Sequence, residues 1–267
     1  MNCRLKFVRL SIIVIVAFCC CQPAFATILL YYYDGHTVYL AADSLRVTRQ
    51  FDQKGSATIV STETVCKIIA RSDLAFMATR EITEALVSIK DGKVSYRGIE
   101  PNIRTLSVHV LENRTTSITQ KEDDLLLVAK DFLQGFRSEF NRNIFLGGIL
   151  ISFEGAQPTV SRYAVNYPKP DGGKATFIER SVSIAQDSIR AAGYSDRIML
   201  TKIGDINRQL SRHIGYKGGP VKMLTDILQA TLPSQTEVGP PYVVIAIDHA
   251  KSGRILLGQN FCRNSIK

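Results

Sequence analysis

TILLYYYDGHTVYLAAD, residues 27–43, is the most informative stretch of the chain. Two runs rich in β-branched and aromatic residues flank an Asp-Gly pair, and this pattern is typical of a β-hairpin. A three-residue loop places Thr27 directly opposite Asp43, with both side chains on one face of the hairpin. A two-residue loop shifts the pairing by one residue and leaves them diagonal. Both registers place Thr27 near a carboxylate.

The segment before this hairpin predicts a secretory signal peptide. Three basic residues, Arg4, Lys6 and Arg9, precede an apolar run at 10–18 and a Pro-Ala-Phe-Ala stretch at 23–26. A basic start, a short apolar run and an A-x-A site are the three parts of such a peptide. We therefore expect cleavage after residue 26, with export to the periplasm or the extracellular space.

Two other outcomes for this segment stay open. An uncleaved membrane anchor is one, although the apolar run is shorter than the ~20 residues that a membrane span requires. A lipoprotein is the other, because cysteines stand at 19–21, although Phe18 occupies a place where a small residue is expected. With cleavage after residue 26, we expect no membrane association of the mature protein.

The composition is that of an ordinary globular protein. Of 267 residues, 45% are hydrophobic and 21% are charged, and no internal repeat is evident, so residues 27–267 are expected to form one domain. Cleavage removes three of the 33 Lys and Arg and none of the 24 Asp and Glu. No basic run longer than two residues remains, so nucleic-acid binding is not expected. The four histidines show no metal-ligand spacing, and we expect neither a metal nor a cofactor.

A second hairpin is predicted from strands at 65–71 and 74–78, joined by Ser72-Asp73. A two-residue loop makes Lys67 face Ala78, at the open end of the hairpin. The alternative is that Lys67 is an edge residue whose ammonium group extends into water.

The remaining pattern predicts an α+β protein in which antiparallel sheets pack against helices. Helices are expected at 81–90, 122–140, 181–192, 205–214 and 221–232. Further hairpins are expected from 144–153 with 159–167, and from 242–248 with 254–259.

Several of these residues resemble a known family. Thr27, the hairpin and the AADSLRVT sequence at 41–48 are similar to the start of proteasome β-type and related bacterial N-terminal-nucleophile (Ntn) hydrolases. The CKII sequence at 66–69 is similar to the strand that carries the family's catalytic lysine. The resemblance implies a four-layer αββα sandwich, with two antiparallel sheets between helix layers. It also implies Thr27 as nucleophile with Asp43 and Lys67 as catalytic partners, and a homo-oligomeric assembly.

The sequence departs from the family after the second hairpin. Where the family places a glycine that serves the oxyanion hole, this chain has Ala78-Thr79-Arg80. The backbone N–H groups of Thr79 and Arg80 are the candidate donors in its place. The family's C-terminal Asp and Ser or Thr also have only a loose match, at 234–240.

The residues and the resemblance together predict a threonine-type peptidase or amidohydrolase that acts on peptide or other amide bonds. An N-terminal threonine carries its own base, because the reference pKa of its α-amine is about 7.7–8.0. Two alternatives stay open: a non-catalytic binding or assembly subunit of the same fold, and an unrelated exported binding protein. In both, Thr27 is merely a small residue after a cleavage site.

Two cysteines, Cys66 and Cys262, remain after cleavage. Export permits oxidation, so a disulfide is a possible pairing that would tie the C-terminal tail to the strand carrying Lys67. The alternative is a buried Cys66 with a free thiol, because side chains alternate along a strand.

Overall fold

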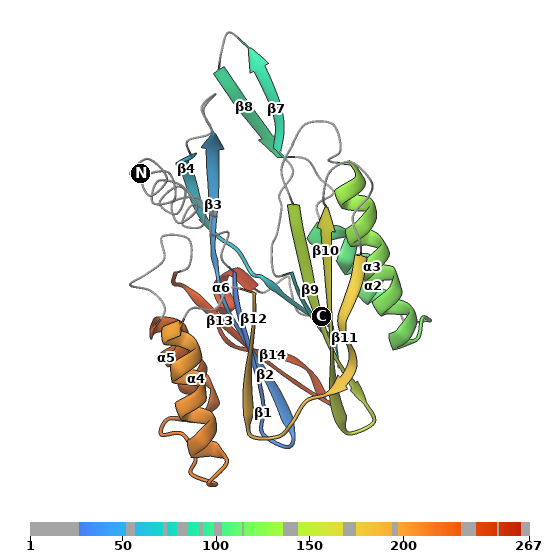
Figure 1. Ribbon diagram of the computed structural model, residues 1–267. Coiled ribbons are helices and arrows are strands. Elements are labelled where there is room, and N and C mark those ends of the chain that lie inside the picture. Colours follow the sequence, from blue (N-terminus) through green and yellow to red (C-terminus); the bar gives the residue numbers. More distant parts are fainter. Residues whose placement is uncertain are drawn as a thin grey trace, which may run out of the picture.

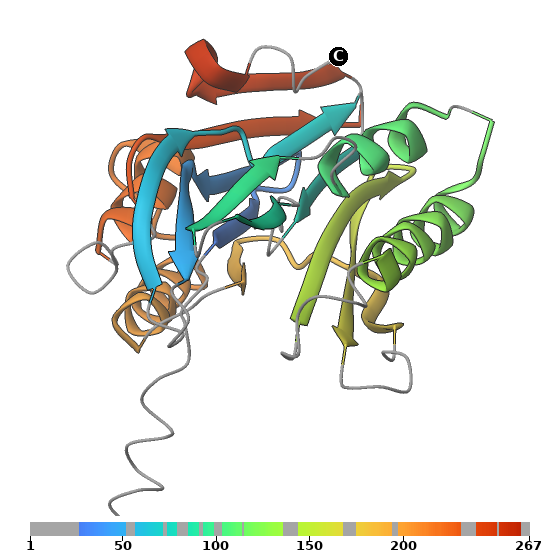
Figure 2. The ribbon, with the colours of Figure 1, turned by 90° about the horizontal axis from the view of Figure 1, so that it is seen from above.

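The computed structural model shows an α+β protein with two five-stranded antiparallel sheets (Figures 1 and 2). The structure describes these residues: 27–51, 57–71, 74–78, 85–90, 93–98, 103–113, 115–135, 144–167, 175–193, 197–230, 239–249 and 251–262. The expected signal peptide lies outside them.

The first sheet has the strand order β12-β1-β2-β13-β14. Its strands are β1 (Ile28–Tyr33), β2 (Thr37–Asp43), β12 (Ser188–Gly193), β13 (Tyr242–Asp248) and β14 (Lys251–Leu257). The predicted opening and closing hairpins therefore share one sheet, and β2 of the first pairs with β13 of the second.

The second sheet has the order β11-β10-β9-β6-β5. Its strands are β5 (Ile68–Arg71), β6 (Leu74–Ala78), β9 (Ile144–Glu154), β10 (Gln157–Tyr167) and β11 (Ala175–Ser183). Gly148 of β9 lies opposite Tyr163 of β10, and a Cβ atom at Gly148 would come within 2.4 Å of the tyrosine ring. The glycine therefore makes room for a buried aromatic ring.

Helices lie on the outer faces of both sheets (Figure 1). They are α2 (Ile103–Glu112), α3 (Ile118–Gly135), α4 (Arg197–Leu210) and α5 (Gly219–Ala230). A short helix, α6 (Gln259–Cys262), follows β14, and its Cys262 belongs to the apolar cluster that contains residues of both sheets. The pair α4 and α5 contacts the first sheet, and α2 and α3 contact the second. None of the described helices is long and apolar enough to cross a bilayer.

Three apolar clusters hold these elements together. One contains residues of both sheets, including Leu29 and Tyr31 of β1 and Ile149 of β9. A second joins the other face of β1 to α4 and α5, and a third joins the second sheet to α2 and α3. This packing is consistent with a sandwich of sheets and helices.

The opening hairpin is shifted by one residue from the three-residue-loop register. Leu29 pairs with Ala42 and Tyr33 with Val38, so the loop is the two-residue alternative, Gly35-His36. The Asp34 carboxylate accepts N–H bonds from His36 and Thr37, and Gly35 takes a φ of 99°. This local bonding selects the tighter turn, since an Asp side chain that caps its own turn stabilises it.

The second hairpin has the predicted register, because Ile68 pairs with Met77 and Arg71 with Leu74. Continued by one residue, this register places Lys67 opposite Ala78. Strand β5 begins at Ile68, so Lys67 lies just before the strand rather than within it.

Two of the predicted helices are wrong. Within 81–90, residues Ala85–Lys90 form strand β7, which pairs with β8 (Lys93–Gly98). Within 181–192, the chain forms the end of β11 and most of β12. Val87 and Ile89 stand two residues apart, a spacing that suits a strand. On β11, exposed apolar side chains weakened the two-residue apolar period that indicates a strand.

Other elements were missed or begin at other residues than predicted. Helix α2 and the hairpin of β3 (Leu45–Phe51) with β4 (Ala57–Thr64) were not predicted. Helix α3 begins four residues earlier than expected, because Ser117 caps it: the Ser117 hydroxyl accepts the Gln120 N–H at 3.2 Å. Helix α4 begins eight residues earlier than predicted and ends at Leu210.

Candidate functional site

The structure brings Asp43 and Lys67 into direct contact. Lys67 Nζ donates to Asp43 Oδ2 at 2.6 Å, and both side chains are almost completely buried. The lysine therefore points into the protein and forms an ion pair, which disagrees with the alternative of an edge lysine extending into water.

Asp43 also contacts the start of β1. Its Oδ1 accepts the backbone N–H of Ile28 at 2.9 Å. Thr27, one residue earlier, is 8% exposed. One carboxylate thus connects the residue that follows Thr27 to the lysine ammonium group.

Burial sets the electrostatics of this pair. Loss of solvent raises the pKa of the Asp43 carboxyl above its ordinary value, while Lys67 and the Ile28 N–H oppose that rise. Tyr242, the residue opposite Asp43 on β13, has its pKa raised to about 12 by burial and by the charge of Asp43.

A disulfide joins Cys66 to Cys262, with Cα atoms 5.0 Å apart. Cys66 directly precedes Lys67, and Cys262 ends α6. The C-terminal region is thus tied covalently to the residue next to the lysine, in the arrangement that the sequence left open.

Two residues next to Asp43, one along the chain and one across the sheet, carry hydroxyl groups to which the sequence assigned no role. Ser44 Oγ and Tyr242 OH are buried, and neither has a hydrogen-bond partner among the described residues. Ser44 follows the aspartate in the AADS sequence, so its position was the available signal. Nothing local in the sequence pointed to Tyr242, which reaches Asp43 only through the pairing of β2 with β13.

The candidate oxyanion-hole residues Thr79 and Arg80 lie outside the described residues, which end in this region at Ala78. In the described part of the chain, no group of three or more His, Cys, Asp or Glu side chains has a geometry that would hold a metal ion.

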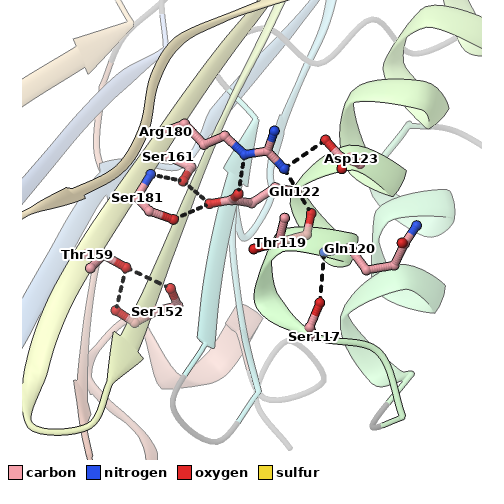
Figure 3. Close-up of polar contacts among 10 residues, drawn as sticks. All are labelled: Ser117, Thr119, Gln120, Glu122, Asp123, Ser152, Thr159, Ser161, Arg180 and Ser181. Atoms are coloured by element: carbon pink, nitrogen blue, oxygen red, sulfur yellow. Dashed lines mark hydrogen bonds and ion pairs between the residues drawn. The ribbon is translucent and has the colours of Figure 1, made fainter.

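A second buried carboxylate, Glu122, lies at the start of α3 and faces β10 and β11 (Figure 3). It accepts hydrogen bonds from the hydroxyls of Ser161 and Ser181 and from Arg180 Nε. Arg180 also bonds Asp123, and the Ser161 hydroxyl accepts the N–H of Ser181 at 2.8 Å. These contacts fix α3 against the second sheet.

No protein-family model matches the chain, and no curated protein matches it. Among solved structures, the chain is similar to the Gly-1 mutant of Anbu from Hyphomicrobium sp. strain MC1. The sequence identity is 11% and the TM-score is 0.47, over 90% of this chain and 91% of that chain.

Proposed function

We propose that residues 27–267 form an exported N-terminal threonine hydrolase of peptide or other amide bonds, in a four-layer αββα fold of the Ntn-hydrolase type. The observation that carries the proposal is the buried Asp43 carboxylate, which binds the Ile28 N–H at 2.9 Å and the Lys67 ammonium group at 2.6 Å. A charged pair therefore lies at the start of β1, next to the proposed nucleophile. The signal-peptide pattern supplies the cleavage that exposes Thr27.

The reaction is an acyl transfer. After cleavage behind residue 26, the neutral α-amine of Thr27 takes the proton of the Thr27 hydroxyl, and the oxygen attacks the carbonyl carbon of the substrate. The protonated amine then gives its proton to the leaving nitrogen as the C–N bond breaks, which leaves an ester on Thr27. Water hydrolyses the ester with the same amine as base.

Asp43 and Lys67 support this chemistry by their charges. The Lys67 ammonium group disfavours a second positive charge nearby, so it keeps a larger share of the Thr27 amine neutral near pH 7. The Asp43 carboxylate holds the lysine charged and oriented. It also fixes the Ile28 N–H, and through it the backbone of the adjacent Thr27.

The decisive experiment is covalent trapping of the mature N-terminus. A peptide epoxyketone that reacts with both the hydroxyl and the free amine of an N-terminal threonine is incubated with protein beginning at Thr27. We expect one adduct, located on Thr27 by mass spectrometry. Protein beginning at Ala26 is the matched control, because one extra residue blocks the amine, and Thr27→Ala is the second.

Maturation is tested separately by Edman sequencing of the exported protein, which should begin at Thr27. A mature N-terminus at Phe25 or Ala26 would contradict the mechanism, because the free amine would then stand on the wrong residue.

A second candidate function is a non-catalytic binding or assembly subunit. The observation in its favour is the Ala78-Thr79-Arg80 sequence, which lacks the glycine that the Ntn family has there. This candidate predicts correct maturation at Thr27 with no epoxyketone adduct and no hydrolysis of a peptide library.

A further inference from the structure

The position of Ser44 relative to Thr27 follows from the observed register of the opening hairpin. The observed ladder ends with Leu29 opposite Ala42, and the same register, carried two residues further, would place Thr27 opposite Ser44. Directly opposed residues of an antiparallel pair share a face, and their Cβ atoms lie about 4.5–5.5 Å apart. Both residues are buried. This register would thus place Ser44, rather than Asp43, across from the proposed nucleophile.

The backbone of Ser44 is held on both sides. Its N–H donates to the carbonyl oxygen of Pro241 at 3.0 Å, and its own carbonyl accepts the N–H of Val65 at 2.8 Å. The side chain therefore projects from a fixed point where three segments of the chain meet.

The hydroxyl of Ser44, unlike the backbone groups of the same residue, has no hydrogen-bond partner among the described residues. It is fully buried and has no hydrogen-bond partner within the described part of the chain, the neighbouring Thr27 hydroxyl included. A buried unsatisfied hydroxyl costs about 1–3 kcal/mol, so such groups in folded proteins call for an explanation.

Cleavage changes the chemistry opposite Ser44. In the intact chain, the nitrogen of Thr27 is an amide with one hydrogen. Once residues 1–26 are removed, it becomes an amine with two hydrogens, or three when protonated, and so gains donors that the intact chain does not offer.

We propose that Ser44 is a positioning residue for the N-terminal amine: its Oγ accepts an N–H bond from the freed α-amine of Thr27. This bond restrains rotation about the Cα–N bond, so that the amine lone pair faces the Thr27 hydroxyl. The inference rests on the proposed function for its role in turnover, but the contact itself does not depend on turnover.

An acceptor beside the amine favours its protonated form, because a hydrogen bond from a charged donor is stronger than one from a neutral donor. Removal of the hydroxyl should therefore lower the pKa of the amine. It should also lower kcat about 10- to 100-fold, the equivalent of one lost hydrogen bond to a charged group, while KM changes less than about twofold.

The test compares three proteins that all begin at Thr27: the unaltered chain, Ser44→Ala, and Ser152→Ala. Ser152 is a buried serine whose hydroxyl pairs with Thr159 on the second sheet, so it controls for loss of a buried hydroxyl elsewhere. The pKa of the Thr27 amine is measured by NMR on protein labelled with nitrogen-15 at threonine, and kcat and KM are measured on a fluorogenic peptide amide. We expect only Ser44→Ala to lower the amine pKa and kcat.

The outcomes separate the two proposals. A lower amine pKa in Ser44→Ala, in a chain that hydrolyses nothing, supports the Ser44 contact and contradicts the proposed hydrolase. Turnover by the unaltered chain with an unchanged amine pKa in Ser44→Ala overturns the positioning role and leaves the hydrolase standing. If Ser44→Ala is unfolded by circular dichroism, Ser44→Cys keeps the side-chain volume with a much weaker acceptor, and the same amine titration decides.

Discussion

Asp43 and Glu122 are both buried carboxylates with a basic partner, yet their surroundings differ. Glu122 is surrounded by donors from β10 and β11, as Figure 3 shows. The side chain of its partner Arg180 is 40% exposed. Asp43 has a buried lysine as its partner, and the hydroxyls of the adjoining residues Ser44 and Tyr242 have no partner among the described residues.

The difference separates a structural role of Glu122 from the catalytic role that we propose for Asp43. A carboxylate whose hydrogen bonds are satisfied within the fold stabilises the packing of the elements that supply its donors. Buried polar groups that stay unsatisfied, such as the hydroxyls of Ser44 and Tyr242, instead cost free energy. Buried charged groups in such surroundings are candidates for a catalytic role.

The sharpest way to break the comparison is to remove the groups of the proposed site one at a time. We expect Thr27→Ala, Lys67→Ala and Asp43→Asn each to lower kcat/KM by about a factor of 10³ or more, because the groups act as a unit. Glu122→Gln should keep kcat/KM within about threefold in the folded fraction. Steady-state kinetics, with circular dichroism to verify folding, measure both. Unchanged turnover in Lys67→Ala would make the buried ion pair a structural feature.

The disulfide gives the next largest effect, since it ties the residue next to Lys67 covalently to α6. The 196-residue separation between Cys66 and Cys262 predicts a loss on the order of 4–5 kcal/mol in the free energy of unfolding for Cys66→Ser. Urea denaturation of the oxidised protein and of this variant gives the value. Alkylation of both thiols in denatured, unreduced exported protein would contradict the bridge.

The free energy of unfolding should fall more when Glu122 is replaced than when the adjacent Asp123 is replaced. Glu122→Gln replaces a carboxylate that accepts from two hydroxyls and a guanidinium, and should lower the free energy of unfolding by about 2 kcal/mol. Asp123→Asn is the matched control, because Asp123 also binds Arg180 but is half exposed, and its loss should cost less than about 1 kcal/mol. Equal losses in urea denaturation would remove the distinction between the two carboxylates.

The smallest effect concerns the tyrosine beside Asp43. Tyr242→Phe deletes a buried hydroxyl without a described partner, so we expect the free energy of unfolding to rise by about 1 kcal/mol at neutral pH. The pKa of Tyr242 is raised from 10 to about 12, so the folded state favours the neutral phenol. The unaltered protein should therefore lose stability as the pH rises through this window, and Tyr242→Phe should lose less. Denaturation curves at pH 7, 10 and 11.5 measure both.

Local sequence signals predicted the parts of the site that depend on local structure. The Asp-Gly pair located the first hairpin, and Ser72-Asp73 set the register that brings Lys67 to the end of the second. The first register was less certain, because the sequence does not show whether Asp34 caps its own turn. That shift of one residue in the register would put Ser44, instead of Asp43, across from Thr27.

Contacts between distant segments were not predictable in the same way. Glu122 meets Ser161 and Ser181 only because α3 packs on β10 and β11, and no spacing in the sequence encodes that meeting. The helix expected over 181–192 failed for a related reason. Among the described strands, β12 pairs only with β1 at the edge of its sheet, and such a half-exposed strand carries a weak apolar pattern.

The position of β1 in its sheet determines when, during synthesis and folding, this strand can gain both of its partners. On one side β1 pairs with the next strand along the chain, and on the other with β12, which begins 155 residues after β1 ends. The strand that follows Thr27 is therefore synthesised well before β12 and cannot be held from both sides until β12 exists. A nucleophile attached to such a strand is assembled late, so its reactivity would itself report that folding is complete.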